Sequence, residues 1–154
     1  MSSTQFSAIL SSYGEAIGIE GLCLDEQACC MLELNGTLTT LMWHEGADTL
    51  IVYAPIGIVA EETDRALLYR ELLEATAPGG ETGGMAIGLD PELDLLTLSV
   101  ALPGPALNAP MLCEFLDFFA DRAACWRMTV EARQKEYALR PQMDDSAAEG
   151  GLQV

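Results

Sequence analysis

The chain has 154 residues, a mass of 16.5 kDa and a formal net charge of −17, from 24 acidic and 7 basic side chains. Half of the residues are hydrophobic, which excludes general disorder and predicts one folded domain with a core. The negative charge opposes nucleic acids and anionic lipid surfaces and favours a neutral or basic partner, although solubility alone explains such a charge equally well.

The N-terminus has no basic leader, and no apolar run approaches the ~18 residues of a membrane span. The spacing of the five cysteines is not that of a disulfide framework. They are Cys23, Cys29, Cys30, Cys113 and Cys125. We therefore expect a cytoplasmic protein with reduced thiols and no membrane insertion.

The first segment predicts an amphipathic helix over residues 2–17. Phe6, Leu10 and Tyr13 recur at intervals of four and three residues and form an apolar stripe. A serine before the stripe can cap the start of the helix, and Gly18 can end it.

Three strand-like runs follow and predict an antiparallel meander. They cover residues 29–34, 37–43 and 49–54, and we expect Pro55 and Gly57 to end the third. The second and third runs are apolar at almost every position. Either both faces of this sheet are covered, or one face is a binding surface.

A second helix is predicted over residues 61–76. Glu61, Glu62 and Asp64 fall in its expected first turn, where the helix dipole favours acids. Its leucines suit a core and a protein interface equally well.

Two short apolar strands are then predicted at residues 85–89 and 95–102, joined by an acidic turn. Asn108 can cap a last helix that begins near residue 109 and runs to about residue 139. The order is helix, three antiparallel strands, helix, two strands and helix, which predicts an α+β domain.

We assign residues 1–140 to this domain. Residues 141–154 lack periodicity and are expected to form an acidic tail.

No residue pattern predicts a catalytic or metal centre. Cys29 and Cys30 are adjacent, so on a strand their side chains point to opposite faces, and no cysteine pair has zinc-ligand spacing. His44 is the only histidine, and no nucleophile motif accompanies it. We expect no cofactor and no metal, although a cysteine brought beside His44 by folding stays open.

Five segments carry a family resemblance. They read LCLDEQACCMLEL, TLIVYAPIGIVAE, RALLYRELLEA, ETGGMAIGLDPELDLLTLSVALP and FLDFFADRAACWR. The hairpin with its GG and LDPE motifs, followed by a helix that contains AxxWR, is the most specific part. In this order the segments resemble the class I type III secretion chaperones of Gram-negative bacteria, the Tir-chaperone-like family.

The resemblance implies a cytoplasmic homodimer without catalytic activity. Such a dimer binds the N-terminal chaperone-binding segment of one or more secreted effectors and keeps it soluble and competent for secretion. The resemblance implies that the segment runs through apolar grooves of the first helix and first sheet and can pair with a sheet edge. It also implies the export ATPase as a targeting partner.

On this resemblance, candidate residues of the effector groove are Phe6, Leu10, Tyr13, Leu41, Trp43, Ile51 and Tyr53. Candidate residues of the dimer interface are Leu67, Leu68, Leu72, Leu73, Leu96 and Leu98. A slip of one residue along a strand exchanges its two faces, so the strand candidates are equally compatible with a place in the core.

Two alternatives stay open. A regulatory protein of the same fold would titrate a secretion-gene regulator. A small enzyme would use His44 and a cysteine in a concave site.

Overall fold

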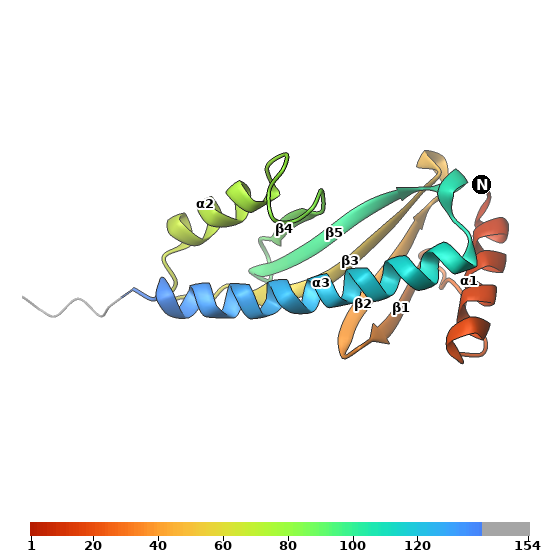
Figure 1. The fold of residues 1–154 in the computed structure, drawn as a ribbon, viewed down its shortest axis with the longest axis horizontal. Coiled ribbons are helices and arrows are strands. Elements are labelled where there is room, and N and C mark those ends of the chain that lie inside the picture. Colours follow the sequence, from red (N-terminus) through yellow and green to blue (C-terminus); the bar gives the residue numbers. More distant parts are fainter. Residues whose placement is uncertain (140–154) are drawn as a thin grey trace, which may run out of the picture.

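The computed structural model describes residues 1–139, so the predicted tail over residues 141–154 lies outside the described residues. The predicted element order is confirmed (Figure 1). The elements are α1 (Ser3–Ile17), β1 (Cys29–Leu34), β2 (Thr37–His44), β3 (Thr49–Ile58), α2 (Arg65–Thr76), β4 (Ala86–Asp90), β5 (Leu95–Pro103) and α3 (Ala109–Glu136), with 3-10 turns at Glu45–Ala47 and Gly104–Ala106.

Capping residues fix the ends of α1 and the start of α3. Ser2 and Gln5 form a reciprocal capping box at the start of α1, and Gly18 ends the helix in the left-handed conformation. The side chain of Asn108 accepts a hydrogen bond from Met111 N at the start of α3. These boundaries agree with the sequence because each depends on a local signal.

The predicted meander and hairpin form one antiparallel sheet of five strands in the order β1-β2-β3-β5-β4. β3 is the centre of this sheet, because it pairs with β2 on one side and with β5 on the other.

The prediction that Pro55 and Gly57 end the third strand is wrong, because β3 continues to Ile58. β2 pairs with β3 only as far as Tyr53, so Pro55 lies beyond the β2 ladder, where a missing N–H costs little. The register shifts between Pro55 and Gly57, as in a β-bulge. A Cβ atom at Gly57 would lie 2.9 Å from Val130 Cγ1, so the glycine lets α3 approach the strand.

The predicted start of the second helix is also wrong. The helix begins at Arg65, and Asp64 is its N-cap, accepting hydrogen bonds from Ala66 N and Leu67 N. Glu61 and Glu62 precede the cap, so they do not lie in the first turn. Asp64 acts as the N-cap rather than as a first-turn residue because its carboxylate satisfies two free backbone N–H groups directly.

All three helices cover the same face of the sheet. The register places Cys30, Leu41, Val52 and Val100 in one row on that face, because directly paired residues share a face. α3 contacts β1, β2 and β3, and α2 contacts β4. α1 joins the same layer through Phe6, whose ring stacks on Trp43 at 4.8 Å.

Ion pairs attach α2 to its neighbours. Arg65 donates two hydrogen bonds to the carboxylate of Asp94, at 2.7 and 3.1 Å, which ties the helix to the β4–β5 turn. This contact lowers the pKa of Asp94, so its stabilising effect is present at neutral pH and is lost as the pH falls through that lowered pKa. Arg133 and Tyr137 both donate to Glu71, which ties α2 to α3.

Candidate functional site

The face of the sheet opposite the helices is uncovered in the described part of the chain, and we call it the open face. Alternation along the strands places its large apolar side chains on β1, β2 and β3. They are Met31, Leu38, Met42, Ile51 and Tyr53. Met31 is 64% exposed and Leu38 is 46% exposed, whereas the other three are half-buried against one another.

The rest of the open face is flat and almost uncharged. On β5 and β4 it carries mostly small residues, among them Ser99, Ala101 and Ala86, and the register also places Leu95 and Ile58 on this face at its far end. The acids of this face, Glu33 and Asp90, lie on the two edge strands. The open face therefore has large apolar side chains on β1–β3 beside mostly small side chains on β5–β4. A surface of this shape can hold an extended or helical segment.

The edge of β1 adds unpaired backbone groups to this surface. Cys29 N donates to Asp25 Oδ1 at 2.9 Å, and Asp25 N donates to Cys29 O at 2.7 Å, so the backbone of Cys29 faces away from β2 and is already satisfied. Because direction alternates along a strand, Met31 and Glu33 also face outward. A short stretch of edge is thus available for pairing with another strand.

Five of the seven predicted groove residues lie in the core in this structure. Phe6, Leu10, Tyr13, Leu41 and Trp43 are buried among the helices and the covered face of the sheet. Burial, with smaller effects of nearby Cys113, Asp117 and Cys30, raises the pKa of Tyr13 to about 12. No side chain of these five offers surface to a partner here, and their role in effector binding stays a prediction.

Ile51 and Tyr53 do lie on the open face, next to residues that sequence reasoning missed. The missed residues are Met31, Leu38 and Met42. The turn at Asn35-Gly36 carries part of the signal, because it fixes the register that places Met31 opposite Thr40, on the same face as Leu38 and Met42.

The dimer candidates separate in a similar way. Leu68, Leu72, Leu96 and Leu98 are buried within the chain. Leu73 is 71% exposed and borders an apolar groove of about 250 Å³ between α2 and β4. The α2–β4 groove is lined by Tyr69, Leu72, Leu73, Ile87, Gly88, Leu89 and Leu96.

Leu67 is also exposed, but it borders a different and more polar groove, between α2 and α3. The two exposed leucines of α2 therefore lie on different sides of the helix.

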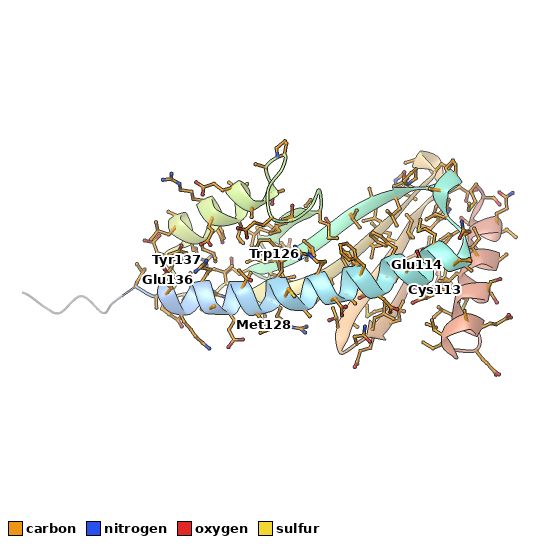
Figure 2. All side chains as sticks on the ribbon, in the orientation of Figure 1. Cys113, Glu114, Trp126, Met128, Glu136 and Tyr137 are labelled. Carbon is orange, nitrogen blue, oxygen red and sulfur yellow. The ribbon has the colours of Figure 1, made fainter. Side chains whose placement is uncertain are left out.

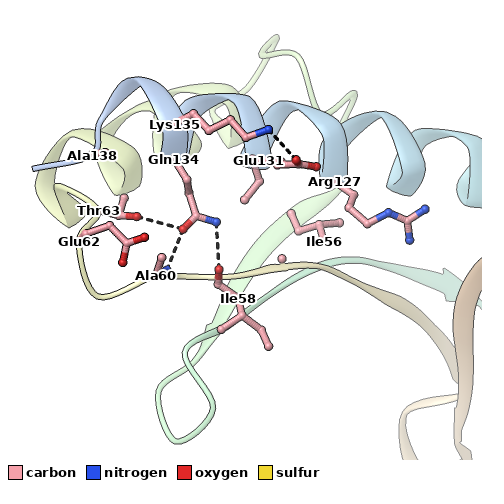
Figure 3. A pocket seen from close by; sticks show the side chains of 12 residues that line it. Ile56, Ile58, Ala60, Glu62, Thr63, Arg127, Glu131, Gln134, Lys135 and Ala138 are labelled. Carbon is pink, nitrogen blue, oxygen red and sulfur yellow. Dashed lines mark hydrogen bonds and ion pairs between the residues drawn. The ribbon is translucent and has the colours of Figure 1, made fainter.

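A further groove, of about 560 Å³, lies between the end of β3 and α3 (Figure 3). Gln134 closes it: its Oε1 accepts from Ala60 N and Thr63 Oγ1, and its Nε2 donates to Ile58 O. Its lining includes the ion pair between Lys135 and Glu131 but no histidine or cysteine. These hydrogen bonds hold α3 against the end of β3 and the segment that follows it, so we assign the groove a structural role.

His44 has a structural contact in this structure. Its Nδ1 accepts a hydrogen bond from Ala47 N at 3.2 Å and so caps the turn after β2. Burial raises the pKa of the Cys30 thiol, which lowers its reactivity at neutral pH. Among residues 1–139, no group of three or more His, Cys, Asp or Glu side chains could hold a metal ion.

None of the helices within residues 1–139 is both long and apolar enough to cross a membrane.

The sequence matches the Tir chaperone protein (CesT) family over residues 8–127. The chain belongs to this family. The match covers most of α1, the whole sheet, α2 and most of α3, so it includes both the open face and the α2–β4 groove. Among curated proteins, no sequence match was found.

Several solved structures with the same fold are protein complexes. The ExsC-ExsE complex matches with a TM-score of 0.72 and 17% identity, over 83% of this chain and 95% of the matched chain. The HopA1-SchA chaperone-effector complex matches with a TM-score of 0.62 and 16% identity, over 80% and 93%. The ExoU-SpcU complex from the type III secretion system of Pseudomonas aeruginosa matches with a TM-score of 0.61 and 13% identity, over 82% and 98%.

The placement of Phe6 in the core and Met31 on the surface predicts a large difference in stability between two alanine variants. Phe6→Ala should lower the free energy of unfolding by about 3–5 kcal/mol, because it leaves a cavity against Trp43. Met31→Ala should change it by less than about 0.5 kcal/mol. Urea unfolding at one protein concentration measures both. Equal effects of the two substitutions would contradict this assignment of the faces.

Proposed function

We propose that the protein is a cytoplasmic, non-catalytic chaperone for a secreted effector of a type III secretion system. Membership of the Tir chaperone family supports the chaperone role. The HopA1-SchA structure, which has the same fold, is a chaperone-effector complex. The export ATPase stays a predicted partner.

The open face is the observation that carries this proposal. A sheet of five strands with all its helices on one side exposes apolar side chains that a monomeric protein normally hides. An effector segment would cover Met31, Met42, Ile51 and Tyr53 with its own apolar residues. The transfer of apolar area from water drives such binding without requiring a fixed sequence, which suits a chaperone.

The edge of β1 gives the bound segment a direction. A strand of the effector that pairs with the outward backbone groups of Met31 and Glu33 would continue the sheet. Affinity would come from main-chain hydrogen bonds, and selectivity from the side chains that reach the open face. The net charge of −17 favours a segment with basic residues.

Affinity purification of the tagged chain from the native bacterium under secreting conditions, followed by mass spectrometry, tests this proposal. We expect a secreted protein, bound through a segment near its N-terminus. Ile51→Asp should abolish its recovery, because a carboxylate on the open face would be buried without a partner.

Leu67→Asp is the matched control. It introduces a carboxylate at an exposed leucine of α2, on the helix side of the sheet, so recovery should persist. Recovery of no secreted protein would refute the chaperone role, and full recovery with Ile51→Asp would move the site off the open face.

We further propose that the protein is a homodimer that associates through the α2–β4 groove. Leu73 and the partly exposed Leu89 project beside a concave apolar surface, and a second copy would present the same pair in return. Two copies placed in this way leave both open faces free for effector segments.

Leu73→Glu should convert the dimer into a monomer of 16.5 kDa in light scattering after size exclusion. Leu67→Glu, on the other side of the same helix, should leave the dimer intact. A monomeric parent protein would contradict the dimer, and the reverse behaviour of the two variants would place the interface on the α2–α3 side.

A further inference from the structure

α3 carries a second apolar stripe on the side that faces away from the sheet. Phe118, Cys125, Met128 and Ala132 follow one another at intervals of seven, three and four residues, the spacing of one helix face with a heptad repeat. The side toward the sheet is filled separately, by Leu116, Trp126 and other buried residues. Figure 2 shows Met128 and Trp126 on opposite sides of the helix. We call this set of four the outer stripe.

The outer stripe is exposed in the described part of the chain. Phe118 is 54% exposed, Met128 is 71% exposed, and Cys125 and Ala132 are also exposed. A single exposed apolar residue needs no explanation. Four of them in heptad spacing along about 21 Å of helix form a continuous seam instead, because each residue adds about 1.5 Å.

Three acids surround the N-terminal part of the seam. Glu114, Asp117 and Asp121 lie within one turn of Phe118, and all three are exposed. None of them forms an ion pair within residues 1–139, whereas Glu71, Glu74, Asp94 and Glu131 do. The seam thus combines an aromatic anchor with acids that form no ion pair within residues 1–139.

We propose that the outer stripe is a docking site for an amphipathic basic helix of a partner protein. Apolar residues of that helix, spaced by three and four, would pack along Phe118, Cys125 and Met128. Its lysines and arginines would lie beside Glu114, Asp117 and Asp121. The small Cys125 allows the partner helix to approach closely between Phe118 and Met128, and the small Ala132 allows the same beyond Met128.

A second copy of the chain fits this surface poorly. Asp121 lies in the middle of the seam. Parallel packing of a second α3 would set it against its own counterpart, and antiparallel packing about Cys125 would set it near Met128. Parallel packing brings two carboxylates together, and antiparallel packing sets the carboxylate against an apolar thioether, so both arrangements bury Asp121 unfavourably.

The outer stripe is separate from the surfaces proposed for the effector and the dimer. The open face lies on the opposite side of the sheet from α3, and the α2–β4 groove lies on the covered face, between α2 and β4. A partner helix on the outer stripe would therefore bind without displacing an effector segment or a second copy.

A synthetic helical peptide tests the proposal on the full-length chain. The probe has about three heptads, leucines at the seam positions and lysines beside them at one end. A control peptide of equal charge and composition has its leucines in scrambled order, because any basic peptide is attracted to so acidic a protein. Binding is measured by fluorescence anisotropy, and its position by alkylation of cysteines followed by mass spectrometry.

The chain supplies its own positional control, because Cys125 and Cys23 are both exposed but only Cys125 lies in the seam. The ordered peptide should slow alkylation of Cys125 several-fold and leave Cys23 unchanged. Phe118→Asp with Met128→Asp should abolish this protection, Asp117→Lys with Asp121→Lys should weaken it, and Leu38→Asp on the open face should not alter it.

Equal binding of the ordered and scrambled peptides, protection of Cys23 without Cys125, or no binding at all would overturn the proposal. A parent dimer that Phe118→Asp with Met128→Asp turns into a monomer would also overturn it, since a second copy would then occupy the seam.

Discussion

The structure depends on the packing of a single helix layer against one face of the sheet. α3 passes over β3 at Gly57, where a side chain would collide with Val130, and its backbone at Ala120 accepts a hydrogen bond from Thr37 Oγ1 on β2. α1 is held by the stack of Phe6 on Trp43, and α2 by the pairs of Arg65 and Glu71. Within residues 1–139, these contacts place all the helices on one side and leave the other side of the sheet open.

This one-sided arrangement gives the protein distinct surfaces with distinct chemistry. The open face has apolar side chains and a short unpaired edge, which suits a segment without a fixed shape. The α2–β4 groove is apolar and concave, which suits a second copy. The outer stripe of α3 is apolar and acidic, which suits a basic helix. Separate placement lets a chaperone hold its effector while it contacts other proteins.

The sequence predicted the fold well because most boundaries depend on local signals. Ser2, Gly18 and Asn108 cap their helices as predicted, and the two hairpin strands form where apolar runs flank the acidic turn. The end of β3 was wrong because the tolerance for Pro55 depends on where β2 stops, a tertiary property. The start of α2 was wrong because acids before a helix can serve either as a cap or in the first turn.

The candidate site was harder to predict because both faces of the central strands are apolar. Leu41 and Trp43 point to the helices, whereas Ile51 and Tyr53 point away, and composition does not distinguish the two pairs. The helix residues Phe6, Leu10 and Tyr13 formed a clear stripe, and a stripe of this kind marks burial before it marks binding. The register set by the Asn35-Gly36 turn shows which strand residues share a face. The position of the helices then shows which of the two faces is covered.

Hydrogen exchange of the backbone amides of β1 tests the central claim most directly. On addition of the effector segment, the outward amides of Met31 and Glu33 should become protected, while the amide of Leu32, which faces β2, should change little. This alternating pattern would show that a strand has joined the edge beside the open face. Unchanged exchange at Met31 and Glu33, with protection confined to α1 or α2, would contradict the account.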